Sequence, residues 1–316
     1  MPEGGLILGM DVGGTNLRLG IFRGGDCVDT LRVEAHLRER CLRAESSAAA
    51  ESAVLDILTA AIAQIRQRHP QLRGVGIAFP GFIQGDGTLL QSPNLPGLHH
   101  LALGAALQER CGLPVLVEND ANAAAFGEFV RERGRQPGLE HLLYVGLGTG
   151  VGGGFILHGQ PWRGAHGAAM EVGHLIVVPG GRRCGCGNQG CLEQYASATG
   201  VRLSYTERTG HAPALPVIAQ LAREGNADAR AAFALAGNTL GQALAHLLKV
   251  LDVSVLRLGG GMSAAWDCFA PVLQERLEAD LIPVLRGTVD LRRGNGDDQA
   301  GMRGAALLAA ARQGGG

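Results

Sequence analysis

The stretch Leu-Ile-Leu-Gly-Met-Asp-Val-Gly-Gly-Thr, residues 6–15, decides the fold class. Its first half is typical of a buried β-strand, and apolar runs at residues 17–22 and 28–33 follow across glycine-bearing turns. We therefore expect three strands in a meander. A strand pattern at residues 142–146 runs into a second glycine–threonine turn, Gly-Leu-Gly-Thr-Gly at residues 146–150. The similar openings indicate two related α/β modules.

The rest of the chain alternates helical patterns with short apolar runs, which is typical of α/β layers. Helices are expected at residues 47–68, 101–111, 121–133, 228–251 and 301–312, and further strands at 75–79, 115–117 and 253–258. At roughly 100–200 residues per domain, 316 residues suffice for two domains. We expect a small α/β domain of residues 1–120 with 301–316, and a large one of residues 121–300.

Composition excludes lysine-dependent phosphate binding. Lysine occurs once, at Lys249, whereas glycine accounts for 50 of the 316 residues. Because Lys249 lies in His-Leu-Leu-Lys-Val, the sequence has no Walker A loop, and a Schiff-base mechanism would depend on this one residue. Any bound phosphate must be held by backbone amides, hydroxyl groups and a metal ion.

Charge and cysteine usage indicate a cytoplasmic protein. The net charge is −1, so no global field favours nucleic acid or an anionic membrane. The sequence opens without a basic segment before an apolar run, and no apolar run is expected to span a bilayer. The cysteine number is odd, seven, and three of them cluster, which favours metal ligation over disulfides.

The first glycine–threonine turn has the chemistry of a phosphate site. Gly13 and Gly14 allow consecutive backbone N–H groups to face one ligand, because glycine accepts backbone angles that other residues avoid. Thr15 adds a hydroxyl donor, and Asp11 at the strand end is placed to hold Mg²⁺. A tight hairpin with a capping aspartate explains this turn equally well on its own.

The second turn repeats this chemistry at Thr149 and Gly150, again with a plain glycine-rich turn as the alternative. Gly259 and Gly260 open a third glycine group after an apolar strand, where bare backbone lets a flat ring approach. The three groups together indicate bound ATP.

A carboxylate follows the strand at residues 115–117. Asp120, in Glu-Asn-Asp-Ala-Asn at residues 118–122, is placed to accept a proton from a hydroxyl group that attacks a phosphoryl group. It equally fits the N-cap of the helix expected at residues 121–133. Glu118 is expected to be a structural neighbour.

Four possible metal ligands lie within 18 residues: His174, Cys184, Cys186 and Cys191. Three thiolates and an imidazole favour a closed, tetrahedral, structural Zn²⁺ site. Free buried cysteines or a redox pair are the alternatives. Glycines between the ligands allow the loop to fold around a cation.

The order of these motifs resembles the ROK family of sugar kinases over about residues 6–312. The motifs are D-x-G-G-T from Asp11, E-N-D-A-N, G-T-G-x-G-G-G, E-x-G-H, C-x-C-x-x-x-x-C and G-G-G-x-S. The resemblance implies the actin-like, ribonuclease-H-like ATPase fold, with a cleft between two α/β domains. It also implies a homodimer, and a kinase rather than a repressor, because no DNA-binding segment precedes Asp11.

The resemblance further implies phosphorylation of the primary hydroxyl of glucose, N-acetylglucosamine or allose by Mg-ATP, with Asp120 as general base. It assigns to the sugar Gly81, Asn94, Asn119, Glu171, His174 and Glu193. It assigns to Mg-ATP Asp11, Gly13, Gly14, Thr15, Thr149, Gly150, Gly259 and Gly260. In this scheme His174 uses one ring nitrogen for zinc and the other for the sugar.

Two alternatives stay open. Glu193 equally fits an acidic residue at a helix N-terminus, and a non-catalytic sugar sensor is the second candidate function.

The sequence also departs from the family pattern G-E-x-G-H, because Met170 precedes Glu171. Residues 92–96 and 161–167 resemble the allose-kinase branch, whereas residues 182–187 and 301–306 resemble the N-acetylglucosamine-kinase branch.

Overall fold

The computed structural model describes residues 5–294 and 299–314, which fall into two compact units. Unit 1 contains Met1–Glu140, Gly154–Ala169 and Gln299–Gly316, and unit 2 contains His141–Gly153 and Met170–Asp298. The domain boundaries predicted from the sequence, and the cleft expected between the domains, stay predictions.

A five-stranded mixed sheet forms the centre of unit 1. Its order is β3-β2-β1-β4-β8, with β1 at Leu6–Val12, β2 at Asn16–Arg23, β3 at Asp26–Glu34, β4 at Leu72–Phe79 and β8 at Val115–Asn119. The first three strands form the predicted antiparallel meander. β4 and β8 continue from β1 in parallel, so these three strands end at the same edge of the sheet.

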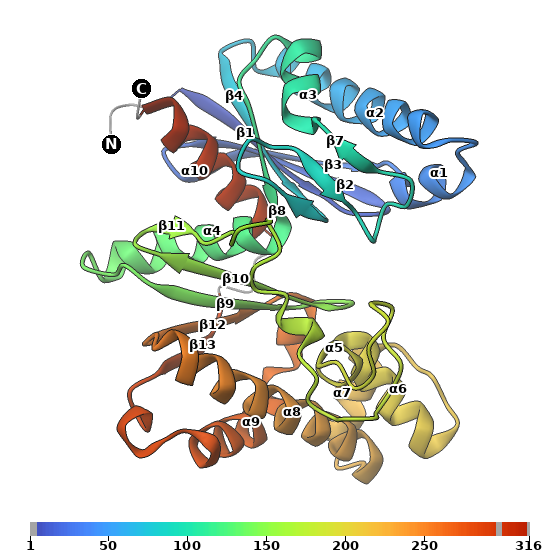
Figure 1. Ribbon diagram of the computed structural model, residues 1–316, viewed down its shortest axis with the longest axis vertical. Helices are drawn as coiled ribbons and strands as arrows, with labels where there is room; N and C mark the ends of the chain where they lie inside the picture. The colour runs from blue at the N-terminus through green and yellow to red at the C-terminus, as the bar shows by residue number, and fades with distance from the viewer. Residues whose placement is uncertain (1–4, 295–298, 315–316) are drawn as a thin grey trace. The chain divides into compact units, whose positions relative to one another are not determined.

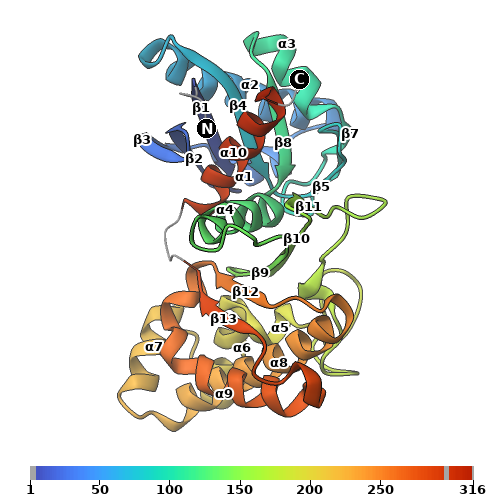
Figure 2. The ribbon, with the colours of Figure 1, turned by 90° about the vertical axis from the view of Figure 1, so that its left-hand side faces the viewer.

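Helices cover both faces of this sheet (Figures 1 and 2). On one side lie α1 (Leu37–Arg43), α2 (Ser47–Arg68) and α3 (Leu103–Cys111), and on the other α4 (Asp120–Arg135) and α10 (Ala300–Gly314). Successive side chains of a strand point to opposite faces. Accordingly Leu8 of β1 is buried in the core with Leu58 of α2, whereas Ile7 packs with Met302 of α10.

Glycines in the sheet let α10 approach closely. A Cβ atom on Gly9 would lie 2.1 Å from the Met302 carbonyl oxygen, and one on Gly76 would lie 1.9 Å from the Ala305 carbonyl oxygen. Neither position has room for a side chain. Part of the glycine content therefore serves helix-on-sheet packing, a use that the sequence analysis did not foresee.

By length and composition, α2 is the one described helix that could cross a bilayer, although the sequence analysis expected no such segment. Its apolar residues Val54, Leu58 and Ile62 are fully buried in the core of unit 1. This burial is typical of a core helix.

Next along the chain, β5 (Phe82–Ile83), β6 (Leu89–Gln91) and β7 (His99–Leu101) form a small antiparallel sheet.

A second five-stranded sheet has the order β11-β10-β9-β12-β13. Its strands are β9 (Leu142–Leu147), β10 (Val151–Leu157), β11 (Gln160–Pro161), β12 (Val255–Gly259) and β13 (Asp290–Arg293). The helices of unit 2 are α5 (Glu193–Ala196), α6 (Ala198–Thr209), α7 (Leu215–Arg223), α8 (Ala227–Leu251) and α9 (Trp266–Asp280), with short 3₁₀ turns at Val172–His174, Gly261–Ala265 and Pro283–Leu285.

The predicted elements are present with small shifts at their ends. The helix expected at residues 47–68 matches α2 at both ends, because Ser46 caps it by accepting a bond from the Ala49 N–H. The helix expected at residues 101–111 begins at Leu103, because Leu101 ends β7. The sequence pattern did not predict α1, α5, α6, α7, α9, β11, β13 or the small sheet.

Candidate functional site

The carboxyl edge of the unit 1 sheet gathers several predicted site residues. In the parallel ladders Asp11 pairs with Ala78, and Phe79 pairs with Asn119. The start of α10 reaches the same edge, since a Cβ on Gly301 would lie 3.5 Å from the Asp11 carboxyl carbon. The predicted Mg²⁺ ligand therefore shares one sheet edge with the strand that leads into Asp120.

Main-chain hydrogen bonds hold the first glycine–threonine turn. The carbonyl groups of Gly14 and Thr15 accept bonds from the next segment, through the N–H groups of Arg38, Ala35 and His36, at 2.8–2.9 Å. Gly13 and Gly14 do not adopt positive φ, so the conformational reason given from the sequence is wrong. A Cβ on Gly13 would lie 2.9 Å from the Asn16 carbonyl oxygen, so close approach accounts for this glycine.

The β8–α4 junction settles the capping alternative. Asn119, not Asp120, is the N-cap of α4, and its Oδ1 accepts the Asn122 N–H at 3.0 Å. The interpretation of Asp120 as the cap is therefore wrong. Asp120 is the first helical residue, and its Oδ1 accepts the Ala121 N–H at 2.9 Å. The helix dipole favours a carboxylate at this position.

Gly81 lies beside this junction, and Asn94 is connected with the first turn. The Asn119 Nδ2 donates to the Gly81 carbonyl at 3.0 Å. Gly81 has a φ of 145°, and a Cβ there would lie 2.6 Å from the Gln91 carbonyl oxygen. Asn94 is exposed, and its carbonyl accepts the Arg38 Nη1 at 3.4 Å. Arg38 thus connects Asn94 with the first turn.

Glu118, expected as a structural neighbour, is joined at this junction by Arg163, for which the sequence suggested no role. Glu118 is fully buried and accepts hydrogen bonds from Asn119, Asn122 and Arg163. One sequence signal points to this pair. Arg163 opens the glycine-rich stretch at residues 163–167, and a carboxylate at the end of a buried strand, such as Glu118, requires a cationic partner.

In unit 2 a carboxylate lies against the second glycine–threonine turn. The Glu193 Oε2 accepts the Val151 N–H at 3.1 Å, and a Cβ on Gly150 would lie 2.1 Å from that oxygen. The Gly148 N–H donates to the Gly150 carbonyl at 2.9 Å, which closes the turn. Thr149 at its tip is exposed.

The third glycine group lies beside this turn. Gly260 has a φ of 80°, and a Cβ there would lie 2.5 Å from the carbonyl oxygen of Leu147, the residue before the turn. A Cβ on Gly259 would lie 2.3 Å from the Tyr144 hydroxyl oxygen. Unit 2 therefore places Thr149, Gly150, Gly259 and Gly260 in one region.

Glu171, His174 and Glu193 form a polar group in unit 2. The His174 Nε2 lies 3.8 Å from the Glu171 Oε2, and the His174 Nδ1 lies 3.6 Å from the Cys184 Sγ. Partial burial raises the pKa of Glu171, the neighbouring His174 lowers it, and the Glu193 carboxylate raises it further. The two ring nitrogens of His174 thus face different partners.

The donor set of His174, Cys184, Cys186 and Cys191 fits a tetrahedral metal ion. Their ligand atoms all lie within 4.8 Å of one another. The sulfur atoms of Cys186 and Cys191 are 3.6 Å apart, far beyond a disulfide bond. Burial raises the pKa of Cys191 to about 12, so its ionised form requires a compensating cation. Three sulfurs and one imidazole are a set that Zn²⁺ takes in closed sites.

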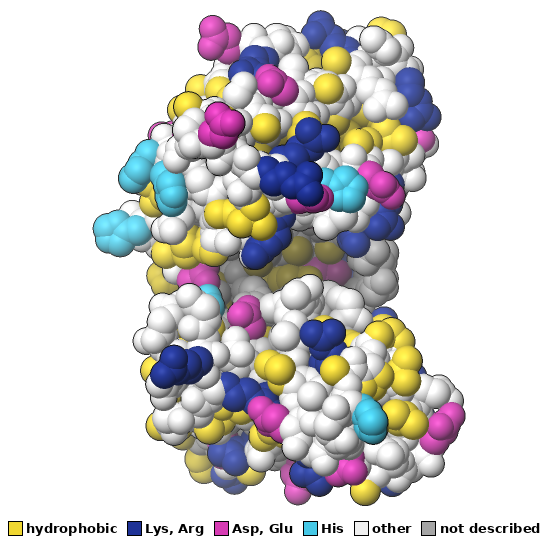
Figure 3. Space-filling view, turned by 90° about the vertical axis from the view of Figure 1, so that its right-hand side faces the viewer, with side chains coloured by type: hydrophobic (Ala, Val, Ile, Leu, Met, Phe, Trp, Pro, Cys, Tyr) yellow, Lys and Arg dark blue, Asp and Glu magenta, His cyan; other side chains and the backbone are white. Residues whose placement is uncertain are grey.

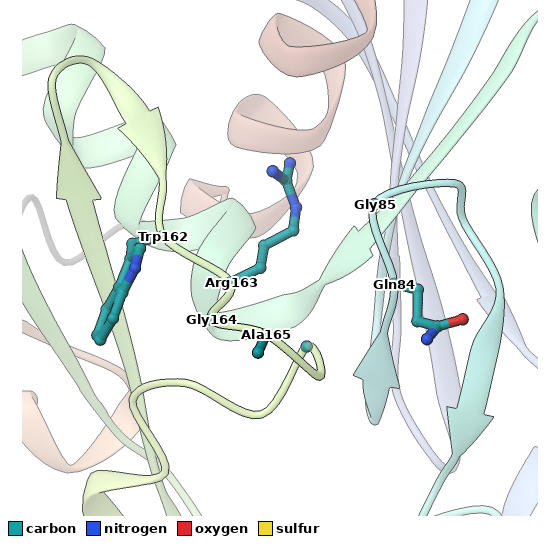
Figure 4. Close-up of a pocket in the computed structure, with 7 residues that line it drawn as sticks. Gln84, Gly85, Trp162, Arg163, Gly164 and Ala165 are labelled. Atoms are coloured by element: carbon teal, nitrogen blue, oxygen red, sulfur yellow. The ribbon is translucent and has the colours of Figure 1, made fainter.

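A pocket of about 420 Å³ opens in unit 1 (Figure 4). Its walls are Gln84 and Gly85 on one side and residues of the segment 162–167 on the other. In Figure 4 the Arg163 side chain extends away from Gly164 and Ala165. On the face shown in Figure 3, positive and negative side chains are interspersed, as the net charge of −1 suggests.

Comparison with known proteins identifies the family of this arrangement. Residues 7–312 match the profile of the ROK family. The chain is 32% identical to a glucokinase of Halalkalibacterium halodurans, over 95% of this chain and 94% of that protein. It is 33% identical to an N-acetyl-D-glucosamine kinase of Salmonella paratyphi B, over 95% of this chain and 98% of that protein.

The structure is similar to that of a ROK family glucokinase from Streptomyces griseus in complex with glucose and AMPPNP. The TM-score is 0.80 at 31% sequence identity, covering 98% of this chain and 99% of the other. The actin-like α/β fold expected from the sequence is confirmed.

Proposed function

The chain belongs to the ROK family, and we propose that it is a sugar kinase that transfers a phosphoryl group from Mg-ATP to the primary hydroxyl of a hexose or N-acetylhexosamine. Glucose, N-acetylglucosamine and allose are the proposed substrates. The observation that carries the proposal is the β8–α4 junction: Asn119 takes over the helix cap, so the Asp120 carboxylate is not required there. Its relatives named glucokinase and N-acetylglucosamine kinase support the reaction class.

In this proposal Asp120 accepts the proton of the attacking hydroxyl. Asn119 orients the sugar beside it. Its bonds to Asn122 and Gly81 use one donor and one acceptor position of an amide that has two of each. Gly81, Asn94, Glu171 and His174 complete the sugar contacts, together with the Glu193 Oε1, since its Oε2 accepts the Val151 N–H.

The two glycine–threonine turns are proposed to hold the polyphosphate through main-chain N–H groups and the Thr15 and Thr149 hydroxyls. Asp11 would hold Mg²⁺, which neutralises charge on the phosphates when bound. Gly13 and Gly150 leave room for the Asn16 carbonyl and the Glu193 carboxylate beside the turns, and Gly14, Gly259 and Gly260 would add main-chain groups to the nucleotide site.

His174, Cys184, Cys186 and Cys191 would hold a structural Zn²⁺. With the His174 Nδ1 on this cluster, its Nε2 is left toward Glu171 and the sugar. We also propose a cytoplasmic location, from the charge and the cysteine usage, and a homodimer, from the family; light scattering on the purified protein tests the second.

The reaction is tested by sugar-dependent release of ADP from Mg-ATP. The panel contains glucose, allose, mannose, fructose, N-acetylglucosamine and N-acetylmannosamine, and turnover of at least one is expected. Asp120→Asn should retain sugar binding and lose ~10²–10⁴-fold in kcat, the contribution of a general base. Asp56→Asn, which alters an exposed carboxylate on α2, is the matched control and should keep full activity.

Two outcomes contradict the proposal. Sugar binding without turnover of any panel member supports the sensor alternative. Near-normal turnover by Asp120→Asn removes that residue from the role of base.

A further inference from the structure

An ion pair between the half-buried Arg163 and the buried Glu118 joins the pocket-lining segment to the junction that carries the proposed base. The Glu118 carboxylate, at the end of β8, is fully buried. Its Oε2 accepts hydrogen bonds from the Arg163 Nε, at 2.8 Å, and from the Arg163 Nη2. The two residues are 45 positions apart in the chain, so this pairing exists only through the tertiary structure.

The other oxygen of the same carboxylate holds the junction that carries Asp120. The Glu118 Oε1 accepts the Asn119 N–H at 3.1 Å and the Asn122 Nδ2 at 3.2 Å. Asn119 and Asn122 lie on either side of Asp120 and are themselves joined by the cap bond. The carboxylate therefore fixes the chain before and after the proposed base.

Arg163 is fixed at its other end by a compact segment. The Arg163 carbonyl accepts the Ala169 N–H at 3.2 Å, which closes the segment on itself. Gly167 has a φ of 69°, and a Cβ there would lie 2.5 Å from the Ile83 carbonyl oxygen. The segment thus lies directly on β5, and its residues 162–165 form one wall of the pocket (Figure 4).

We propose that Arg163 and Glu118 are positioning residues for phosphoryl transfer: the guanidinium of the pocket-lining segment holds the buried carboxylate that sets the orientation of Asn119 and Asp120. The inference rests on the proposed function, because it assigns a role in the same site. A planar guanidinium bound through two nitrogens fixes direction as well as charge. A shift of about 1 Å in a positioned group can cost ~10²-fold in rate.

Steady-state kinetics of Arg163→Met and Arg163→Lys test the proposal with the sugar that the wild type turns over. Arg163→Met should lower kcat ~10–100-fold with less than about a threefold change in the KM for ATP. Arg163→Lys keeps the charge but loses the two-nitrogen geometry, so it should recover only part of kcat.

Arg131→Met is the matched control for folding. Arg131 also pairs with buried carboxylates, Glu128 and Glu132, on the same helix that Asp120 begins. The change removes an arginine partner from buried carboxylates, as Arg163→Met does, and should lower the unfolding temperature while kcat stays within about twofold. Equal losses of kcat in the two variants would show that Arg163 acts only through stability and would overturn the proposal.

Hydrogen exchange supplies a readout that does not need turnover. In Arg163→Met the amides of residues 119–122 should exchange at least ~10-fold faster than in the wild type, and in Arg131→Met they should not. Unchanged exchange in Arg163→Met overturns the proposal. Absence of turnover in the wild type would instead contradict the kinase function, while exchange would still decide whether Arg163 holds the junction.

Discussion

The two glycine–threonine turns are alike in sequence and differ in what holds them. The first turn, at Gly13 and Gly14, is bound by main-chain N–H groups of the segment that follows β3. At the second, the Val151 N–H donates to a side-chain carboxylate, Glu193, which also occupies the space beside Gly150. Main-chain contacts fix the first turn, whereas a side chain that can rotate fixes part of the second.

The difference links the second turn to the cysteine cluster. Glu193 begins α5 two residues after Cys191, and the Leu192 N–H donates to the Leu175 carbonyl at 2.8 Å. A metal ion that orders the cluster would therefore also order the carboxylate on the turn. The first turn has no such dependence among the contacts that its described residues make.

Loss of a metal ligand should produce the largest difference in behaviour between the two turns. In Cys184→Ser, metal analysis should fall from about one zinc per chain toward zero, and kcat/KM should fall ~100-fold or more. The free energy of unfolding should fall as well. Exchange should rise at residues 148–151 and stay unchanged at residues 13–15. Cys268→Ser, outside the cluster, is the control; a zinc-free protein with full activity contradicts the assignment.

Alanine at corresponding glycines should affect different properties of the enzyme. In Gly150→Ala the new Cβ meets the end of a flexible carboxylate, so the KM for ATP should rise ~10-fold with little loss of stability. In Gly13→Ala it meets the Asn16 backbone, so the free energy of unfolding should fall by about 1–3 kcal/mol. Thermal unfolding and steady-state kinetics of both variants test this, and equal effects would remove the distinction between the turns.

The smallest effect is expected for Glu193→Gln. The amide oxygen can still accept the Val151 N–H, so the KM for ATP should stay within about twofold. A sugar contact would lose its charge, and since charged hydrogen bonds are roughly twice as strong as neutral ones, the KM for the sugar should rise ~3–10-fold. A change in the KM for ATP alone would place Glu193 with the nucleotide instead.

Local pattern predicted much of the fold, and tertiary contacts account for what it missed. The meander of β1 to β3 and the long α2 follow from periodicity and a single cap. The cap of α4 could not be predicted in this way, because Asn119 and Asp120 are both good N-cap residues. Which one caps the helix depends on where β8 ends, and β8 ends at Asn119. Glu118 was expected as a structural neighbour, but its pairing with Arg163 was not predicted, because the two residues are distant in sequence.

The candidate metal site followed from the spacing of His174 and the cysteines, because these ligands lie in one loop and need no knowledge of the fold. The use of glycine was predicted only in part. The role of Gly9 and Gly76 in helix packing could not be predicted, because it depends on the position of α10 against the sheet.

The packing of α10 also has a consequence for biosynthesis. Unit 1 begins with the first residues of the chain, yet it takes its last helix from residues after 298. At about 5–20 residues per second, the ribosome needs on the order of 10 to 30 s to pass from residue 140 to residue 299. During that interval the surface formed by Ile7, Gly9 and Gly76 is not yet covered by α10. The nascent chain therefore exposes the part of this sheet face that α10 later covers, and a chaperone could protect it until α10 emerges.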